Sequence, residues 1–304
     1  MNLSIGPFSL SFKIESKSDK SFINMNDIDA INDIYIRHIR KLSKKNLLSR
    51  LDSISIDRDY DTEKAKEILK NEGVLIIRNF INKNSILKLE NIIEDIKNII
   101  NKFRNTNILN FEDQNILIQK FSSKLKNYSE LSMNKKTVFN LRSNQDQGMV
   151  DIFNINLAYP ALGKLFDYEK KVFLNKLISE NYQSDLNNLN LYINEDITKT
   201  RGFHVDNHFH QFKAFIYLTD CLDLNDGPYT YVKKSHTNEI YKKFNTNASR
   251  MLKNNTESPF LITENITPLL SEKGTLIVSN QTGIHRGFPQ SKGHSRIVLV
   301  KKLN

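Results

Sequence analysis

The chain of 304 residues is 39% hydrophobic, which allows a sizeable core in one large or two small domains. Its formal net charge of +10 would suit a polyanionic partner such as nucleic acid or an anionic membrane. The basic residues are interspersed with acidic ones, however, and no basic run alternates with aromatic residues as single-strand binding requires. We therefore expect no nucleic-acid partner, whereas an anionic small-molecule substrate is compatible with the charge. The sequence makes no prediction about the oligomeric state.

Cysteine content and hydropathy indicate the cellular compartment. The single cysteine, Cys221, excludes a disulfide within the chain and a cysteine-based zinc site, and it fits a reducing compartment. No run of about 18 apolar residues exists, so we expect no membrane span. The N-terminus lacks the basic and apolar regions of a signal peptide. We expect a soluble, cytoplasmic protein.

The first part of the chain reads as helical. Residues 1–60 are predicted to be an N-terminal extension that is partly helical. Residues 27–51 carry apolar side chains at helical spacing with basic side chains on other faces, which indicates the helix. From residue 61 a capped helix stops at Gly73, a buried strand follows at 74–77, and Ser85 caps a second helix that runs to residue 100. Residues 61–304 would then form the main domain.

The middle of the chain gives weaker signals. Residues 101–150 read as connecting helix and loop, and the polar segment 144–151 is either an ordered loop facing a substrate or a surface turn. Arg142 is a weak binding candidate in the same segment. A further helix is predicted over 161–181.

The last third of the chain reads as β-structure. Short strands are predicted at 189–193, 203–206, 214–219, 229–232, 274–278, 284–286 and 296–300, with a helical or irregular excursion over 235–253. Short strands separated by turns, after a helical half, favour an α+β protein with a mainly β core, a barrel or jelly roll flanked by the N-terminal helices. The core would lie mainly in residues 187–304.

A possible metal site lies in this β region. His204 and Asp206 are two residues apart on a predicted strand, so their side chains point to the same face. His285, near the end of the chain, supplies a third ligand, and Arg296 follows it. Two histidines and one carboxylate form the facial set that binds non-haem Fe(II) and leaves positions open for a cosubstrate and oxygen. A lone histidine on a strand is more often a satisfied polar group, but this spacing favours metal binding.

The chain resembles the phytanoyl-CoA dioxygenase family over about residues 60–304, including the helix-strand opening around 73–80, and does so strongly in several segments from residue 200 onward. They are residues 202–208, 215–220, 225–236 and 285–287 together with Arg296. The resemblance implies a double-stranded β-helix (jelly roll, cupin-like) and an oxygenase that uses Fe(II), 2-oxoglutarate and O2 on a small molecule. It also implies that His204, Asp206 and His285 bind iron and that Arg296 pairs with the distal carboxylate of 2-oxoglutarate. The chain departs from the family in having no tryptophan, and nothing marks a coenzyme A site.

The expected reaction is hydroxylation of an unactivated C–H bond of a small-molecule metabolite, with release of succinate and CO2. In related halogenases a small residue replaces the carboxylate, so Asp206 favours hydroxylation. Desaturation, ring closure and epimerisation would use the same chemistry and stay open as alternatives. A catalytically silent jelly-roll binding protein is the alternative from another class.

Further side chains are weaker candidates for the same pocket. Asn190, Tyr192 and Thr219 lie on strands that could line it beside 2-oxoglutarate, although alternate strand residues face outward as often. His208 and His210 either support the metal ligands or are polar loop residues. His236 is expected to orient a loop, and His294 to be exposed.

Overall fold

The structure is a computed structural model. It describes residues 2–5, 8–11, 25–57, 61–120, 125–142, 146–178, 189–206, 211–251 and 256–303. The helices are α1 (Met25–Arg40), α2 (Lys44–Ser49), α3 (Thr62–Glu72), α4 (Lys83–Leu87), α5 (Glu90–Arg104), α6 (Tyr128–Ser132), α7 (Ile155–Ala158), α8 (Pro160–Gly163), α9 (Tyr168–Ile178) and α10 (Glu239–Met251). The strands are β1 (Asn2–Ile5), β2 (Phe8–Ser11), β3 (Ser55–Ile56), β4 (Val74–Ile77), β5 (Asn110–Glu112), β6 (Ile116–Lys120), β7 (Thr137–Leu141), β8 (Val150–Phe153), β9 (Leu189–Glu195), β10 (Phe212–Tyr217), β11 (Tyr229–Val232), β12 (Ile266–Pro268), β13 (Leu276–Asn280), β14 (His285–Gly287) and β15 (Ser295–Leu303). No described helix has both the length and the apolar character needed to cross a membrane.

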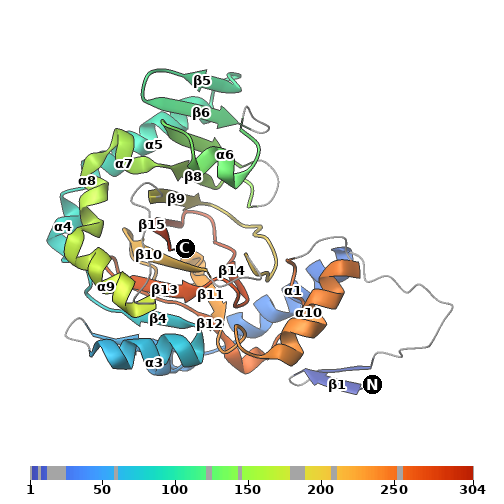
Figure 1. Cartoon of the computed structure of the whole chain (residues 1–304). Helices are drawn as coiled ribbons and strands as arrows, with labels where there is room; N and C mark the ends of the chain where they lie inside the picture. Colours follow the sequence, from blue (N-terminus) through green and yellow to red (C-terminus); the bar gives the residue numbers. More distant parts are fainter. Residues whose placement is uncertain are drawn as a thin grey trace.

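The strands form two main sheets (Figure 1). Within the described ranges, the larger sheet has the order β3-β4-β13-β10-β15-β9-β8-β7-β6-β5 and the smaller one has the order β12-β11-β14. His204 adds an isolated antiparallel bridge to His285 at the β14 edge of the smaller sheet. From β9 to β15 the chain crosses repeatedly between the two sheets, which is the double-stranded β-helix that the sequence predicted.

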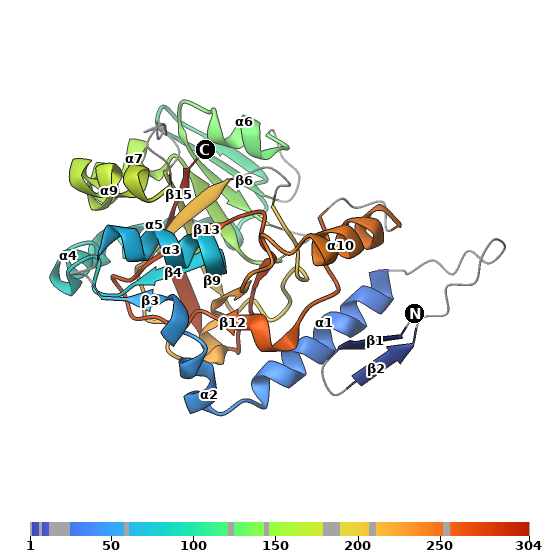
Figure 2. The same ribbon diagram turned by 60° about the horizontal axis from the view of Figure 1, so that its bottom comes forward.

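Side-chain alternation along the strands separates two cores. On β15, Ile297 and Leu299 belong to the cluster shared with the helices, whereas Val298 and Val300 belong to the cluster between the two sheets. Figures 1 and 2 show α3, α5 and α9 on the outer side of the larger sheet. Because strand side chains alternate, every second residue from 296 to 302 faces the interior between the sheets. This parity decides which side chains can reach a site inside the barrel.

The N-terminal residues are part of the same core. Tyr35 of α1 packs edge-on against Phe203 with ring centroids 6.0 Å apart, and its hydroxyl donates to the Pro259 carbonyl at 3.0 Å. The predicted single helix over 27–51 is interrupted, because Ser43 caps a separate helix by accepting from the Asn46 amide at 3.2 Å. Since β3 also pairs with β4, packing does not separate the described residues 25–57 from the rest.

The helix, strand, helix opening is largely as predicted. Asp61 caps α3, and Gly73 ends it in the left-handed conformation with φ of 80°, which favours glycine. The start of the next helix was predicted wrongly at Ser85: the cap is Asn82, and a break before Glu90 divides the segment into α4 and α5.

The largest difference lies in the segment predicted as connecting helix and loop over 101–150. Apart from the end of α5 and the short α6, it forms β5, β6, β7 and the first residue of β8, which continue the larger sheet beyond β9. Polar residues interrupt its apolar runs. Although β5 and β6 form a local hairpin, β6 pairs with β7 and β8 with β9 across longer stretches of chain, so local patterns do not specify the rest of this pairing. The predicted helix over 161–181 is likewise divided, into α8, a 3-10 turn at Lys164–Phe166, and α9.

Candidate metal centre

Two segments far apart in the chain meet at the proposed metal ligands. The amide of His204 donates to the His285 carbonyl at 3.0 Å, and the amide of His285 donates back to the His204 carbonyl at 2.9 Å. This reciprocal pair is an antiparallel bridge that fixes the two histidines side by side. Asp206, two residues after His204, returns to the same face.

The three side chains converge on one point. The Oδ1 atom of Asp206 lies 3.6 Å from Nε2 of His204 and 3.5 Å from Nε2 of His285. One potential ligand atom from each residue lies within 4.8 Å of the other two. The Nδ1 atoms lie 2.7 Å from the Gly202 carbonyl oxygen and 2.9 Å from that of Gly283, so each Nδ1–H donates to a backbone carbonyl. Both Nε2 lone pairs are therefore free to bind a shared cation, as in metal sites with oriented imidazoles.

The charge states suit a divalent cation. Burial lowers the pKa of His204, although the neighbouring carboxylate opposes the shift, so its imidazole is neutral near pH 7. Burial alone would raise the pKa of Asp206, but the Lys213 ammonium and the two imidazoles hold it well below its usual value. Lys213 donates to the other carboxylate oxygen, Oδ2, so Oδ1 stays directed at the histidines.

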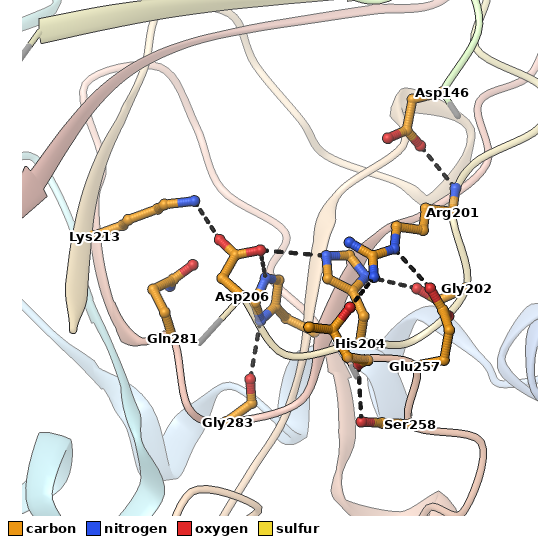
Figure 3. A network of polar contacts seen from close by, with 12 residues as sticks. Asp146, Arg201, Gly202, His204, Asp206, Lys213, Glu257, Ser258, Gln281 and Gly283 are labelled. Atoms are coloured by element: carbon orange, nitrogen blue, oxygen red, sulfur yellow. Dashed lines mark hydrogen bonds and ion pairs between the residues drawn. The ribbon is translucent and has the colours of Figure 1, made fainter. Parts of the chain in front are cut away.

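A buried polar network holds this geometry (Figure 3). Arg201 pairs through Nε with the Glu257 carboxylate at 2.8 Å, and its amide donates to Asp146 Oδ1, also at 2.8 Å. Glu257 is 2% exposed and bridges to the backbone of His204. The amide of Asp206 donates to the Gln281 carbonyl at 3.2 Å. Ligand-bearing segments tied in this way on both sides are preorganised.

The three side chains open into a cavity of about 460 Å³ between the two sheets. Arg296 of β15 lines the same cavity and is 8% exposed. Its Nη1 donates to the Gly227 carbonyl, whereas its Nε has no hydrogen-bond partner among the described atoms. A buried guanidinium with an unused donor at the cavity wall suits a carboxylate, which it can bind with two parallel hydrogen bonds.

Neither protein-family models nor curated proteins match the sequence. Solved structures do match in fold. AviO1 from Streptomyces viridochromogenes Tue57 is 13% identical, with 80% of this chain and 94% of that chain covered and a TM-score of 0.51. The non-heme alpha ketoglutarate dependent carbocyclase SnoK from nogalamycin biosynthesis is 11% identical, with 81% and 84% covered and a TM-score of 0.52. At these identities the likeness establishes the fold, and the resemblance to the phytanoyl-CoA dioxygenase family stays a prediction.

The weaker cosubstrate candidates do not all reach the cavity. Tyr192 lines it. Asn190 is not among the lining residues, and its Nδ2 instead donates to the Tyr128 hydroxyl at 3.0 Å. Thr219 lies past the end of β10, where its hydroxyl accepts from the Ile297 amide at 3.0 Å and lines a different depression near α5.

The other histidines that the structure describes lie away from this cavity. His236 Nε2 lies 2.9 Å from the Lys70 carbonyl oxygen under α3, and His294 pairs with Asp226 at 2.8 Å. Asp223, Asp226 and His294 form a second, more exposed acidic and histidine group. His208 and His210 lie outside the described residues.

Sequence reasoning missed several lining residues, among them Lys213, Gln281, Lys302 and Tyr128. Lys213 is a lone charge within an apolar strand, which is a usable signal for a buried partner. Lys302 shares the parity of Arg296 on β15. Gln281 and Tyr128 lie on segments whose path depends on distant pairing, and no local pattern points to them.

Proposed function

We propose that the protein is an Fe(II)- and 2-oxoglutarate-dependent dioxygenase that hydroxylates an unactivated C–H bond of a small-molecule metabolite. One observation carries the proposal: His204, Asp206 and His285 converge at the cavity that the buried guanidinium of Arg296 also lines. In the balanced reaction, substrate, 2-oxoglutarate and O2 give hydroxylated product, succinate and CO2.

The residues fit both groups chemically. Two neutral imidazoles and one carboxylate suit Fe(II) and leave one positive charge at the centre, so a dianionic cosubstrate is attracted. Arg296 would hold the distal carboxylate of 2-oxoglutarate. Iron with 2-oxoglutarate would supply the activation of O2 needed for C–H oxidation. The protein's own task is to position the substrate and to exclude water. The lining residues Phe215, Tyr229 and Val298 give the cavity an apolar surface that serves this task.

The same site leaves the outcome of oxidation open. SnoK is by its name a carbocyclase, and ring closure, desaturation and epimerisation are the alternatives for this chain. The carboxylate of Asp206 argues against halogenation. A catalytically silent jelly-roll binding protein would need no cation site, and the ionised carboxylate beside two oriented imidazoles favours the enzyme.

Anaerobic titration of the metal-free protein with Fe(II) and 2-oxoglutarate tests the proposal. The readout is the weak visible charge-transfer band that a 2-oxoglutarate chelate of iron gives. We expect the band in wild type and its loss in His204→Ala. His294→Ala is the matched control, because it removes an imidazole from the second acidic group and should leave the band intact. Absence of the band in iron-loaded wild type would favour the binding-protein alternative.

A further inference from the structure

Two lysines face each other across the inner side of the larger sheet. Lys213 of β10 is paired in register with Lys302 of β15, and both line the cavity. Like charges directly opposite each other destabilise an antiparallel pair. Asp206 compensates Lys213 by an ion pair. The second ammonium therefore needs its own explanation.

Among the described residues, four cationic side chains line the cavity, and two of them are paired with carboxylates. Arg142 pairs with Asp146 at 2.8 Å and with Asp151 at 2.5 Å. Lys213 pairs with Asp206, and Arg296 is reserved for the cosubstrate under the proposed function. Lys302 has no carboxylate within ion-pair distance in the described part of the chain.

An aromatic side chain accompanies this unpaired ammonium. The Lys302 Nζ lies 5.3 Å from the centre of the Tyr128 ring. The Tyr128 hydroxyl accepts from Asn190 Nδ2 at 3.0 Å, so its own proton is left to donate. Phe153 packs edge-on against the ring at 5.2 Å and fixes its direction. The cavity therefore offers an oriented hydroxyl donor beside a cation.

We propose that Lys302, Tyr128 and Lys213 form an anion subsite, and that the substrate carries a carboxylate or phosphate group which binds there. That the bound anion belongs to a substrate rests on the proposed function. That an anion binds at this position rests on the lining of the cavity alone. Lys302 lies six residues from Arg296 on β15, a span of about 20 Å along a strand. One cation therefore holds the cosubstrate, while the other anchors a substrate on the side of Lys213 and the metal ligand that it contacts.

Anion binding to the metal-free protein tests the subsite without any turnover. The probes are inorganic phosphate and acetate, titrated calorimetrically against sodium chloride of equal ionic strength. We expect Lys302→Gln to weaken binding of the preferred probe about 10-fold or more, because it removes a charged donor. Tyr128→Phe removes a neutral donor and should weaken binding about 3-fold. Which of the two probes binds more tightly distinguishes a phosphate from a carboxylate substrate.

Two control variants make the outcome specific. Lys88→Gln removes an exposed lysine outside the cavity and should leave probe binding unchanged. Arg296→Lys weakens any probe binding at the cosubstrate position, so the binding that this variant keeps is the part assigned to the subsite, whereas complete loss of probe binding in that variant would assign the anion to the cosubstrate position and overturn the proposal. Equal affinity of wild type and Lys302→Gln would overturn it as well. Without any anion, Lys302→Gln should melt no lower than wild type, because it relieves the repulsion with Lys213.

Failure of the two proposals can be told apart. Lys302→Gln should retain the iron and 2-oxoglutarate band, because Lys302 belongs to neither proposed binding group. Probe binding that depends on Lys302 in a protein without the band would support the subsite and reject the oxygenase. A normal band with probe binding independent of Lys302 would reject the subsite alone.

Discussion

Replacing Arg296 by lysine separates charge from geometry at the proposed cosubstrate site. Lysine keeps the positive charge but loses the planar fork that matches a carboxylate. One hydrogen bond to a charged group contributes about 1.5–3 kcal/mol, so loss of one donor should weaken 2-oxoglutarate binding about 10- to 100-fold. The affinity is measured in the anaerobic titration at saturating Fe(II). The affinity for Fe(II) alone should stay unchanged, because Arg296 is not one of the three converging ligands.

A matched variant controls for general disturbance. Arg50 also donates through Nη1 to a backbone carbonyl, that of Thr263 at 3.1 Å, but it does not line the cavity. Arg50→Lys should bind 2-oxoglutarate as wild type does. Arg296→Lys removes a donor from the Gly227 carbonyl, and Arg50→Lys removes one from the Thr263 and Ile266 carbonyls, so both melting temperatures should fall. Wild-type affinity in Arg296→Lys, or equal losses in both variants, would refute the assignment of Arg296.

Two further predictions concern the surroundings of the site. A methyl group at Gly283 would overlap the buried Tyr231 hydroxyl, so Gly283→Ala should cost about 1–3 kcal/mol of stability. It should also weaken divalent-metal binding, because the Gly283 carbonyl orients His285; unchanged melting and metal affinity would contradict the packing. Burial raises the pKa of the Cys221 thiol to about 12 from 9.0, so the folded protein should resist a thiol reagent at pH 8 and react once unfolded. Since the unfolded thiol ionises first, this contribution to stability is complete below pH 9 and should decline as the pH rises toward 12.

The sequence predicted that the side chains at the site converge, partly because one short-range rule acts on them. Alternation along an extended segment puts His204 and Asp206 on one face, and the same rule puts Arg296 on the inner side of β15. The bridge that brings His285 to His204 is a long-range pairing, which the expected jelly roll implied but no local pattern specifies. The proposed ligand set was thus accessible through fold class and spacing together, and its binding of a metal stays a prediction.

The alternation of side chains along a strand partly explains the positions of the weaker cosubstrate candidates. Asn190 and Tyr192 share the inner side of β9, which the sequence left open, but only Tyr192 reaches the cavity, and Asn190 is engaged by Tyr128. Thr219 lies beyond the last residue of β10, where alternation no longer applies, and its hydroxyl completes the pairing with β15 instead. Parity predicts a direction, whereas the extent of the cavity depends on the neighbouring segments.

The segment 101–153 contains both the strands that were not predicted and several cavity-lining residues that were not predicted. The proposed ligands and Arg296 lie in the part of the chain that follows β9: His204 and Asp206 between β9 and β10, His285 on β14 and Arg296 on β15. Tyr128, Arg142 and Met149 line the cavity from the segment in which no strand was predicted. Because β8 pairs with β9, strands β5 to β8 extend the larger sheet beyond β9, and the connections between them bring these three side chains to the cavity. We therefore expect the proposed ligands to determine how the substrate is oxidised and residues 101–153 to influence which substrate is held, so changes of specificity should be sought there.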